Sequence, residues 1–71
     1  MPEPPALSVV VPAYDEVGAL PDLLAELDAA LEAVPGSHEL IFVDDGSSDG
    51  TGEYLEGLAA ERADVIAIRL P

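Results

Sequence analysis

Two short acidic segments contain the side chains in this sequence that are best suited to binding a ligand. The first is Tyr14-Asp15-Glu16, and the second begins with Asp44-Asp45 and continues into a turn rich in Gly, Ser and Asp. Carboxylates accept hydrogen bonds from the N–H groups of a nucleobase and from ribose hydroxyls, and a tyrosine ring can lie against a base. A phosphate would need a divalent cation to offset the acids. The residue types therefore favour a site for a nucleoside.

Each acidic segment follows an apolar run that has the length of a buried strand. Residues 7–11 precede the first segment and stop at Pro12, residues 39–44 lead into the second, and residues 65–70 form a third run. Runs without polar alternation predict strands that are covered on both faces, as in a parallel sheet. Ligands of open α/β sheets bind outside the carboxyl ends of the strands. We therefore expect both acidic segments at the ligand-binding edge of one sheet.

Two stretches with helical spacing connect these strands. Apolar residues recur at steps of three and four over residues 20–34, where Pro21 suits a first helical position, and again over residues 51–62. Ser48 or Asp49 is expected to cap the second helix. The order is β-α-β-α-β, and right-handed crossovers then predict an α/β fold with parallel strands in the order 3-2-1, half of a doubly wound sheet.

The composition bounds the size and the class of the protein. The chain has 71 residues, no cysteine and a formal net charge of −13. It has room for one small domain, without a disulfide or a cysteine zinc site. So acidic a surface repels nucleic acid, and no apolar run approaches the roughly 20 residues of a membrane span. Residues 1–6 lack the basic region of a secretory signal and are expected to be a disordered lead-in.

The two segments together resemble the start of a family 2 glycosyltransferase. The resemblance is carried by two motifs, Val9-Val10-Val11-Pro12-Ala13-Tyr14-Asp15-Glu16 and Val43-Asp44-Asp45-Gly46-Ser47-Ser48-Asp49-Gly50-Thr51. It is strongest toward the polyprenyl-phosphate sugar synthases, such as dolichyl-phosphate mannose synthase. It implies the GT-A fold, in which a Rossmann-like nucleotide half is joined to an acceptor half. Residues 7–71 would then be the N-terminal, nucleotide-binding part of that domain.

The resemblance also implies roles for individual residues. Pro12, Tyr14 and Glu16 match the family's Pro-x-Tyr-Asn-Glu motif, which lines the nucleoside pocket. Asp45 matches the acid that bonds the base or the ribose, and Asp44 matches the acid that supports the loop. Asp15 stands where the family usually has Asn, and it adds negative charge beside the nucleotide. No catalytic residue is assigned within these residues.

The substrates and cofactors are likewise implied by the resemblance. They are a nucleoside-diphosphate sugar as donor, a polyprenyl phosphate or a saccharide as acceptor, and Mg²⁺ or Mn²⁺ as the metal of an inverting transfer. The family's Asp-x-Asp metal motif lies beyond the third strand, so we expect a truncated domain that is inactive alone and holds no metal itself. The implied location is cytoplasmic, with the cytoplasmic face of the membrane as the place of action.

Other interpretations of the same residues remain open. Asp45–Glu56 matches much of the oxygen spacing of an EF-hand calcium loop, although a strand precedes it. A receiver-like or flavodoxin-like signalling fragment would share the β-α-β order and the acid pair. The first strand is expected to be an unpaired apolar edge that allows self-association. Arg62 and Arg69 are expected to make ordinary surface ion pairs.

Overall fold

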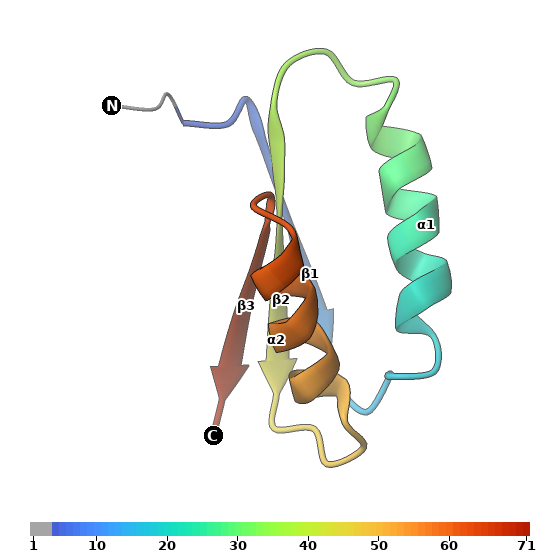
Figure 1. The fold of residues 1–71 in the computed structure, drawn as a ribbon, viewed down its shortest axis with the longest axis vertical. Helices are drawn as coiled ribbons and strands as arrows, with labels where there is room; N and C mark the ends of the chain where they lie inside the picture. The colour runs from blue at the N-terminus through green and yellow to red at the C-terminus, as the bar shows by residue number, and fades with distance from the viewer. Residues whose placement is uncertain (1–3) are drawn as a thin grey trace.

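A parallel sheet of three strands forms the centre of the molecule (Figure 1), and the computed structural model describes residues 4–71. The elements in chain order are β1 (Leu7–Ala13), α1 (Leu20–Leu31), β2 (His38–Asp45), α2 (Thr51–Glu61) and β3 (Val65–Leu70). The strand order is β1-β2-β3, with β2 in the middle and both pairs parallel. The predicted α/β fold and the 3-2-1 order are confirmed.

The element boundaries differ from the prediction at three places. Pro12 lies inside β1 instead of ending it, which is tolerated because β1 is an edge strand and proline only removes a donor. β2 extends to Asp45. α1 ends at Leu31, not near Val34, because the amides of Ala33 and Val34 bond three residues back and Pro35 disfavours a further helical turn.

One continuous core lies between the sheet and the two helices. Its buried members are Ala13, Leu20, Leu31, Leu40, Phe42, Leu55 and Val65, drawn from all five elements. The strand residues among them alternate with exposed or half-buried neighbours, so they point to one face of the sheet. Both helices therefore pack on that face and hold the carboxyl ends of β1 and β2 in place.

The opposite face of the sheet is apolar and exposed in residues 4–71. Val10 is 62% exposed, and Ile66, Ile68 and Leu70 are 42–44% exposed. Val10 is paired in register through Ile41 to Ile66, so these side chains form a continuous surface. The expectation that both faces are covered is therefore wrong for the described residues. In the described residues β1 is an edge strand that pairs with β2 on one side only. Self-association through the free edge of β1 stays a prediction.

The ends of the described chain add little to the sheet. Residues 1–3 of the predicted disordered lead-in lie outside the described residues. Ala6, also in that lead-in, donates its backbone N–H to the carbonyl oxygen of Ser37 at 2.9 Å. Neither α1 nor α2 is long and apolar enough to cross a bilayer.

Arg62 ties three elements together at the amino end of the sheet. Its guanidinium donates to both carboxylate oxygens of Asp28 on α1, each at 3.0 Å, and to both oxygens of Asp64 before β3, at 2.8 and 3.0 Å. These bonds raise the pKa of Arg62 and lower the pKa of Asp64. Arg62 therefore makes the surface ion pairs that were expected, and their bidentate geometry fixes its guanidinium between α1 and the start of β3.

Replacing Asp64 with asparagine should cost about 0.5–1 kcal/mol of unfolding free energy at neutral pH. The Arg62 hydrogen bonds hold the pKa of Asp64 below its ordinary value of 3.8 in the folded chain. The stabilisation is therefore complete above the ordinary pKa and is lost as pH falls through the folded pKa. Urea unfolding of the parent and of Asp64→Asn should give curves that differ at pH 7 and converge toward about pH 2.

The control for this comparison is Glu26→Gln, on the exposed side of α1. It removes one acid without touching Arg62, so its difference from the parent should not follow the same pH profile. A constant difference between the parent and Asp64→Asn from pH 7 to about pH 2 would contradict the prediction.

Candidate functional site

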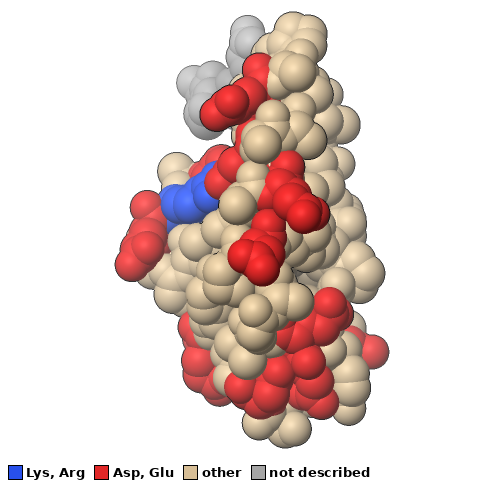
Figure 2. Space-filling model, turned by 90° about the vertical axis from the view of Figure 1, so that its right-hand side faces the viewer, with Lys and Arg blue, Asp and Glu red and all other residues tan. Residues whose placement is uncertain are grey.

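The two acidic loops meet at the carboxyl ends of β1 and β2. The strand register pairs Ala13 with Asp44, so Tyr14 leaves β1 where Asp45 ends β2. Acidic side chains gather at this end of the molecule in Figure 2, apart from the visible basic side chain. Because side chains of a strand alternate, Asp44 points to the helix side and Asp45 to the opposite side. The predicted meeting of the two loops is therefore present in the structure.

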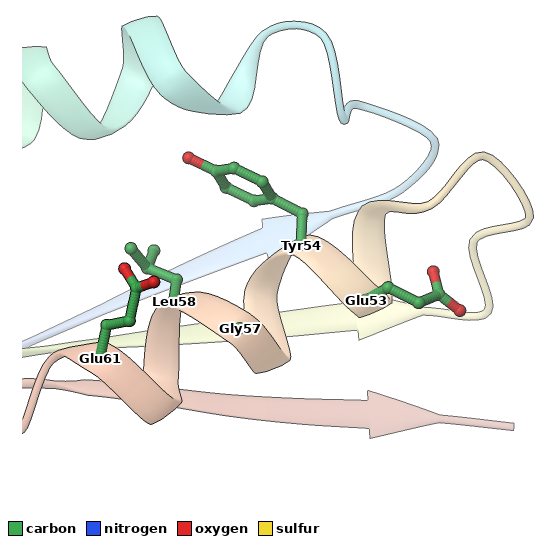
Figure 3. A pocket seen from close by; sticks show the side chains of 5 residues that line it. All are labelled: Glu53, Tyr54, Gly57, Leu58 and Glu61. Atoms are coloured by element: carbon green, nitrogen blue, oxygen red, sulfur yellow. The ribbon is translucent and has the colours of Figure 1, made fainter.

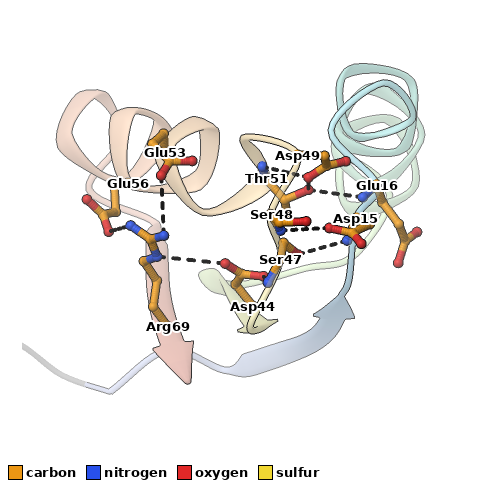
Figure 4. Close-up of polar contacts among 10 residues, drawn as sticks. All are labelled: Asp15, Glu16, Asp44, Ser47, Ser48, Asp49, Thr51, Glu53, Glu56 and Arg69. Carbon is orange, nitrogen blue, oxygen red and sulfur yellow. Dashed lines mark hydrogen bonds and ion pairs between the residues drawn. The ribbon is translucent and has the colours of Figure 1, made fainter. Parts of the chain in front are cut away.

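Hydrogen bonds join the loops into one unit, which we call the loop clasp (Figure 4). Three successive backbone N–H groups of the first loop donate to side chains of the second. The pairs are Asp15 N to Ser47 Oγ (2.8 Å), Glu16 N to Thr51 Oγ1 (3.0 Å) and Val17 N to Asp49 Oδ2 (3.1 Å). In return, the Ser48 N–H donates to Asp15 Oδ1 at 2.8 Å. The clasp leaves little freedom for the first loop to move alone.

The backbone of Asp15 fits its place in the clasp. Its φ is +48°, the left-handed region, and it is the one residue other than glycine with positive φ among residues 4–71. Asp and Asn adopt this conformation more readily than other residues with a side chain. The exchange of the family's Asn for Asp therefore keeps the turn, and Asp15 Oδ1 still accepts the Ser48 N–H.

Asp49 connects the second loop to the first loop and to the start of α2. Its Oδ1 accepts the backbone N–H and the hydroxyl of Thr51, while Oδ2 faces Val17. The Thr51 hydroxyl is the main reason that the pKa of Asp49 lies below its ordinary value. The helix N-cap is Gly50, with φ +96° and no side-chain cap. The prediction that Ser48 or Asp49 is the N-cap is therefore wrong, although Asp49 accepts the N–H of Thr51, the first residue of α2.

Asp44 is a buried structural acid. Its side chain is 1% exposed, its Oδ1 accepts the Ser47 N–H at 3.1 Å, and its Oδ2 lies 3.7 Å from Nε of Arg69. Arg69 in turn contacts Glu56 at 2.8 Å and Glu53 at 3.3 Å. The expectation of an ordinary surface pair for Arg69 is wrong, because it compensates a buried carboxylate. A ligand could reach Asp44 only by displacing these contacts.

The remaining predicted site residues are exposed. Pro12, Tyr14, Glu16 and Asp45 all present surface at the carboxyl end of the sheet, and Tyr14 is 58% exposed. Glu16 Oε1 accepts the backbone N–H of Tyr14 at 3.1 Å, which orients the glutamate toward its own loop. The structure places these four residues around the clasp, and their role in binding a nucleoside stays a prediction.

A divalent metal does not fit the acids of the described part. No three His, Cys, Asp or Glu side chains in residues 4–71 form a group that could hold an ion. Asp44 and Asp45 point to opposite sides of β2, so they cannot chelate one ion together. The calcium-loop hypothesis is also disfavoured, because β2 precedes the loop and the oxygens of Ser47 and Asp49 already accept backbone N–H groups.

A shallow hollow on α2 does not coincide with the predicted site. It has a volume of about 320 Å³ and is lined by Glu53, Tyr54, Gly57, Leu58 and Glu61. In Figure 3 the ring of Tyr54 points toward α1, in line with the packing role that its helical spacing predicts. Because its polar lining is two glutamates, this hollow does not suit a phosphate group.

Two hydroxyl residues of the clasp, Ser47 and Thr51, are not predicted from the sequence. The sequence patterns assign no individual role to Ser47 or Thr51. Polar side chains alternate at Ser47, Asp49 and Thr51, and this alternation was the available signal. It could have indicated that one side of the loop faces a neighbouring segment.

Comparison with known proteins places the fold and the loops in a family. Residues 8–71 match the family model described as Glycosyl transferase family 2. The chain belongs to this family. The family 2 match covers both motifs and all five elements, so the signalling-fragment hypothesis is not supported.

Individual relatives agree with the family 2 assignment. The chain is 42% identical to a protein of Klebsiella pneumoniae subsp. pneumoniae over 65 residues and 42% identical to one of Pseudomonas fluorescens over 65 residues. It is 45% identical to one of Pseudomonas syringae pv. syringae over 58 residues. Each is named undecaprenyl-phosphate 4-deoxy-4-formamido-L-arabinose transferase. The matches cover 90%, 90% and 82% of this family 2 chain but only 20%, 19% and 17% of the relatives.

Proposed function

We propose that residues 7–71 form the nucleoside-binding part of a glycosyltransferase that uses a nucleoside-diphosphate sugar. The observation that carries the proposal is the clasped pair of loops at the carboxyl ends of adjacent parallel strands, within a family 2 sequence. Ligands of open α/β sheets bind at this edge. Tyr14 would lie against the base, and Asp45 and Glu16 would accept hydrogen bonds from the base or the ribose.

We further propose a polyprenyl phosphate as the acceptor, which the names of the relatives support. The acceptor oxygen would attack the anomeric carbon as the nucleoside diphosphate leaves, and the anomeric configuration would invert. In this proposal the residues of this chain hold the nucleoside of the donor. Proton NMR of the product formed by the complete enzyme would show whether the anomer differs from that of the donor.

Replacing Asp45 with alanine should weaken nucleotide binding by about 1–3 kcal/mol, because a buried hydrogen bond to the ligand is lost. That is about five- to 150-fold in the dissociation constant. Folding should be unaffected, since the Asp45 side chain is exposed. The measurement is an amide NMR titration of the 71-residue chain with UDP and with GDP, for parent and variant.

The matched control is Asp22→Ala, which removes one exposed acid in the first turn of α1. It should leave the shifts of Tyr14 and Glu16 on nucleotide addition unchanged. Equal affinity of the Asp45→Ala variant and the parent would contradict the assignment of Asp45. No binding of either nucleotide by the parent would contradict the proposed function itself.

A further inference from the structure

Three of the four side chains that accept hydrogen bonds in the loop clasp belong to the second segment, residues 47–51. Ser47 and Thr51 each use a hydroxyl oxygen to accept a backbone N–H of the first loop. Thr51 is fully buried, and its own hydroxyl hydrogen goes to Asp49, so its side chain is satisfied on both sides. The Thr51 hydroxyl therefore has both its hydrogen and an acceptor position engaged, whereas the Ser47 hydroxyl holds the first loop as an acceptor only.

Ser47 also joins the clasp to the buried acid of β2. Its backbone N–H donates to Asp44 Oδ1, while its side-chain oxygen accepts from Asp15. Ser47 therefore links the buried carboxylate of β2 directly to the first loop. Ser48, the next residue, enters the clasp only through its backbone N–H, and its side chain is exposed.

We propose that Ser47 and Thr51 are positioning residues of the nucleoside site, an inference that rests on the proposed function. Their hydroxyls fix the first loop, and with it Tyr14 and Glu16, beside Asp45 before any ligand arrives. A preformed site avoids the entropic cost of ordering a loop during binding. Loss of one hydroxyl should open the first loop more often and lower affinity without removing a ligand contact.

The experiment compares Ser47→Ala with Ser48→Ala, two substitutions of identical chemistry at adjacent positions. Only the first removes a clasp acceptor, and both keep the backbone contacts of the loop. The first readout is hydrogen exchange of the Asp15, Glu16 and Val17 amides by NMR. The second is the dissociation constant for UDP and for GDP. Ser47→Thr keeps the hydroxyl and serves as the conservative rescue.

Ser47→Ala should speed exchange of the Asp15 amide and weaken nucleotide binding, each by about three- to tenfold. Ser48→Ala and Ser47→Thr should stay within about twofold of the parent on both readouts. Equal behaviour of Ser47→Ala and Ser48→Ala would overturn the proposal, as would faster exchange with unchanged affinity.

A second pair, Thr51→Val and Thr51→Ser, tests the other hydroxyl on the Glu16 amide in the same way. Thermal unfolding of all variants separates local opening from loss of the fold. If the parent binds neither nucleotide, the proposed function fails and, with it, the positioning role. The clasp itself is then still judged by the exchange rates, so the two failures are distinguishable.

Discussion

Alanine at position 52 is expected to destabilise the chain by about 1–2 kcal/mol, although alanine is normally the better helix former. A Cβ built on Gly52 would overlap with Nε of Arg69 and lie 2.6 Å from Oδ2 of Asp44. Arg69 can swing away, because its side chain is long and 40% exposed. Asp44 would then keep a buried carboxylate without its cation, and this loss outweighs the gain in helix propensity.

Gly57→Ala is the control for this prediction, because it lies in the same helix and a Cβ there would meet nothing within 4 Å. It should stabilise the chain by up to about 1 kcal/mol. Urea unfolding followed by circular dichroism measures both variants. If Gly52→Ala were as stable as Gly57→Ala, the close packing of Arg69 and Asp44 against α2 would not matter for stability.

Asp44→Ala should cost about 2–3 kcal/mol of unfolding free energy. This cost should be larger than that of Asp45→Ala, the same substitution at the next residue. Asp44→Ala leaves the Ser47 N–H without its acceptor and removes the buried partner of Arg69. Asp45→Ala should change stability by less than about 0.5 kcal/mol, because its side chain is exposed.

The comparison of the two acids separates a folding role from a binding role. The same urea experiment gives stability, and the nucleotide titration described above gives affinity. We expect Asp44→Ala to lose stability and Asp45→Ala to lose affinity. A result in which both variants lose only affinity would show that Asp44 contacts the ligand, contrary to its burial.

Much of the fold could be predicted from local patterns. Apolar runs of strand length, helical spacing between them and right-handed crossovers were enough to give the elements and the order of the sheet. The boundaries were predicted less well, because a proline is expected to end a strand, whereas Pro12 continues β1 at the edge of the sheet. Side chains of β2 point alternately to the two faces of the sheet, so Asp44 is buried and Asp45 is exposed. The two-residue period of a strand is enough to predict this difference from the sequence.

The contacts that hold the site together could not be predicted in the same way. The clasp joins residues more than thirty positions apart, and it depends on the left-handed turn at Asp15. The Arg62 contacts with Asp28 and Asp64 depend on how α1 lies against the end of α2. Such partners are set by packing in three dimensions, whereas sequence patterns report on one element at a time.

The engagement of both arginines has a consequence for the electrostatic field of the molecule. Arg62 and Arg69 are the only lysine or arginine side chains of the sequence, and each is surrounded by carboxylates. The outward field is therefore that of a polyanion, which slows the approach of an anionic ligand and is weakened by dissolved salt. Added salt should thus hasten the encounter with a diphosphate, the reverse of its effect on proteins that attract phosphate through a basic surface.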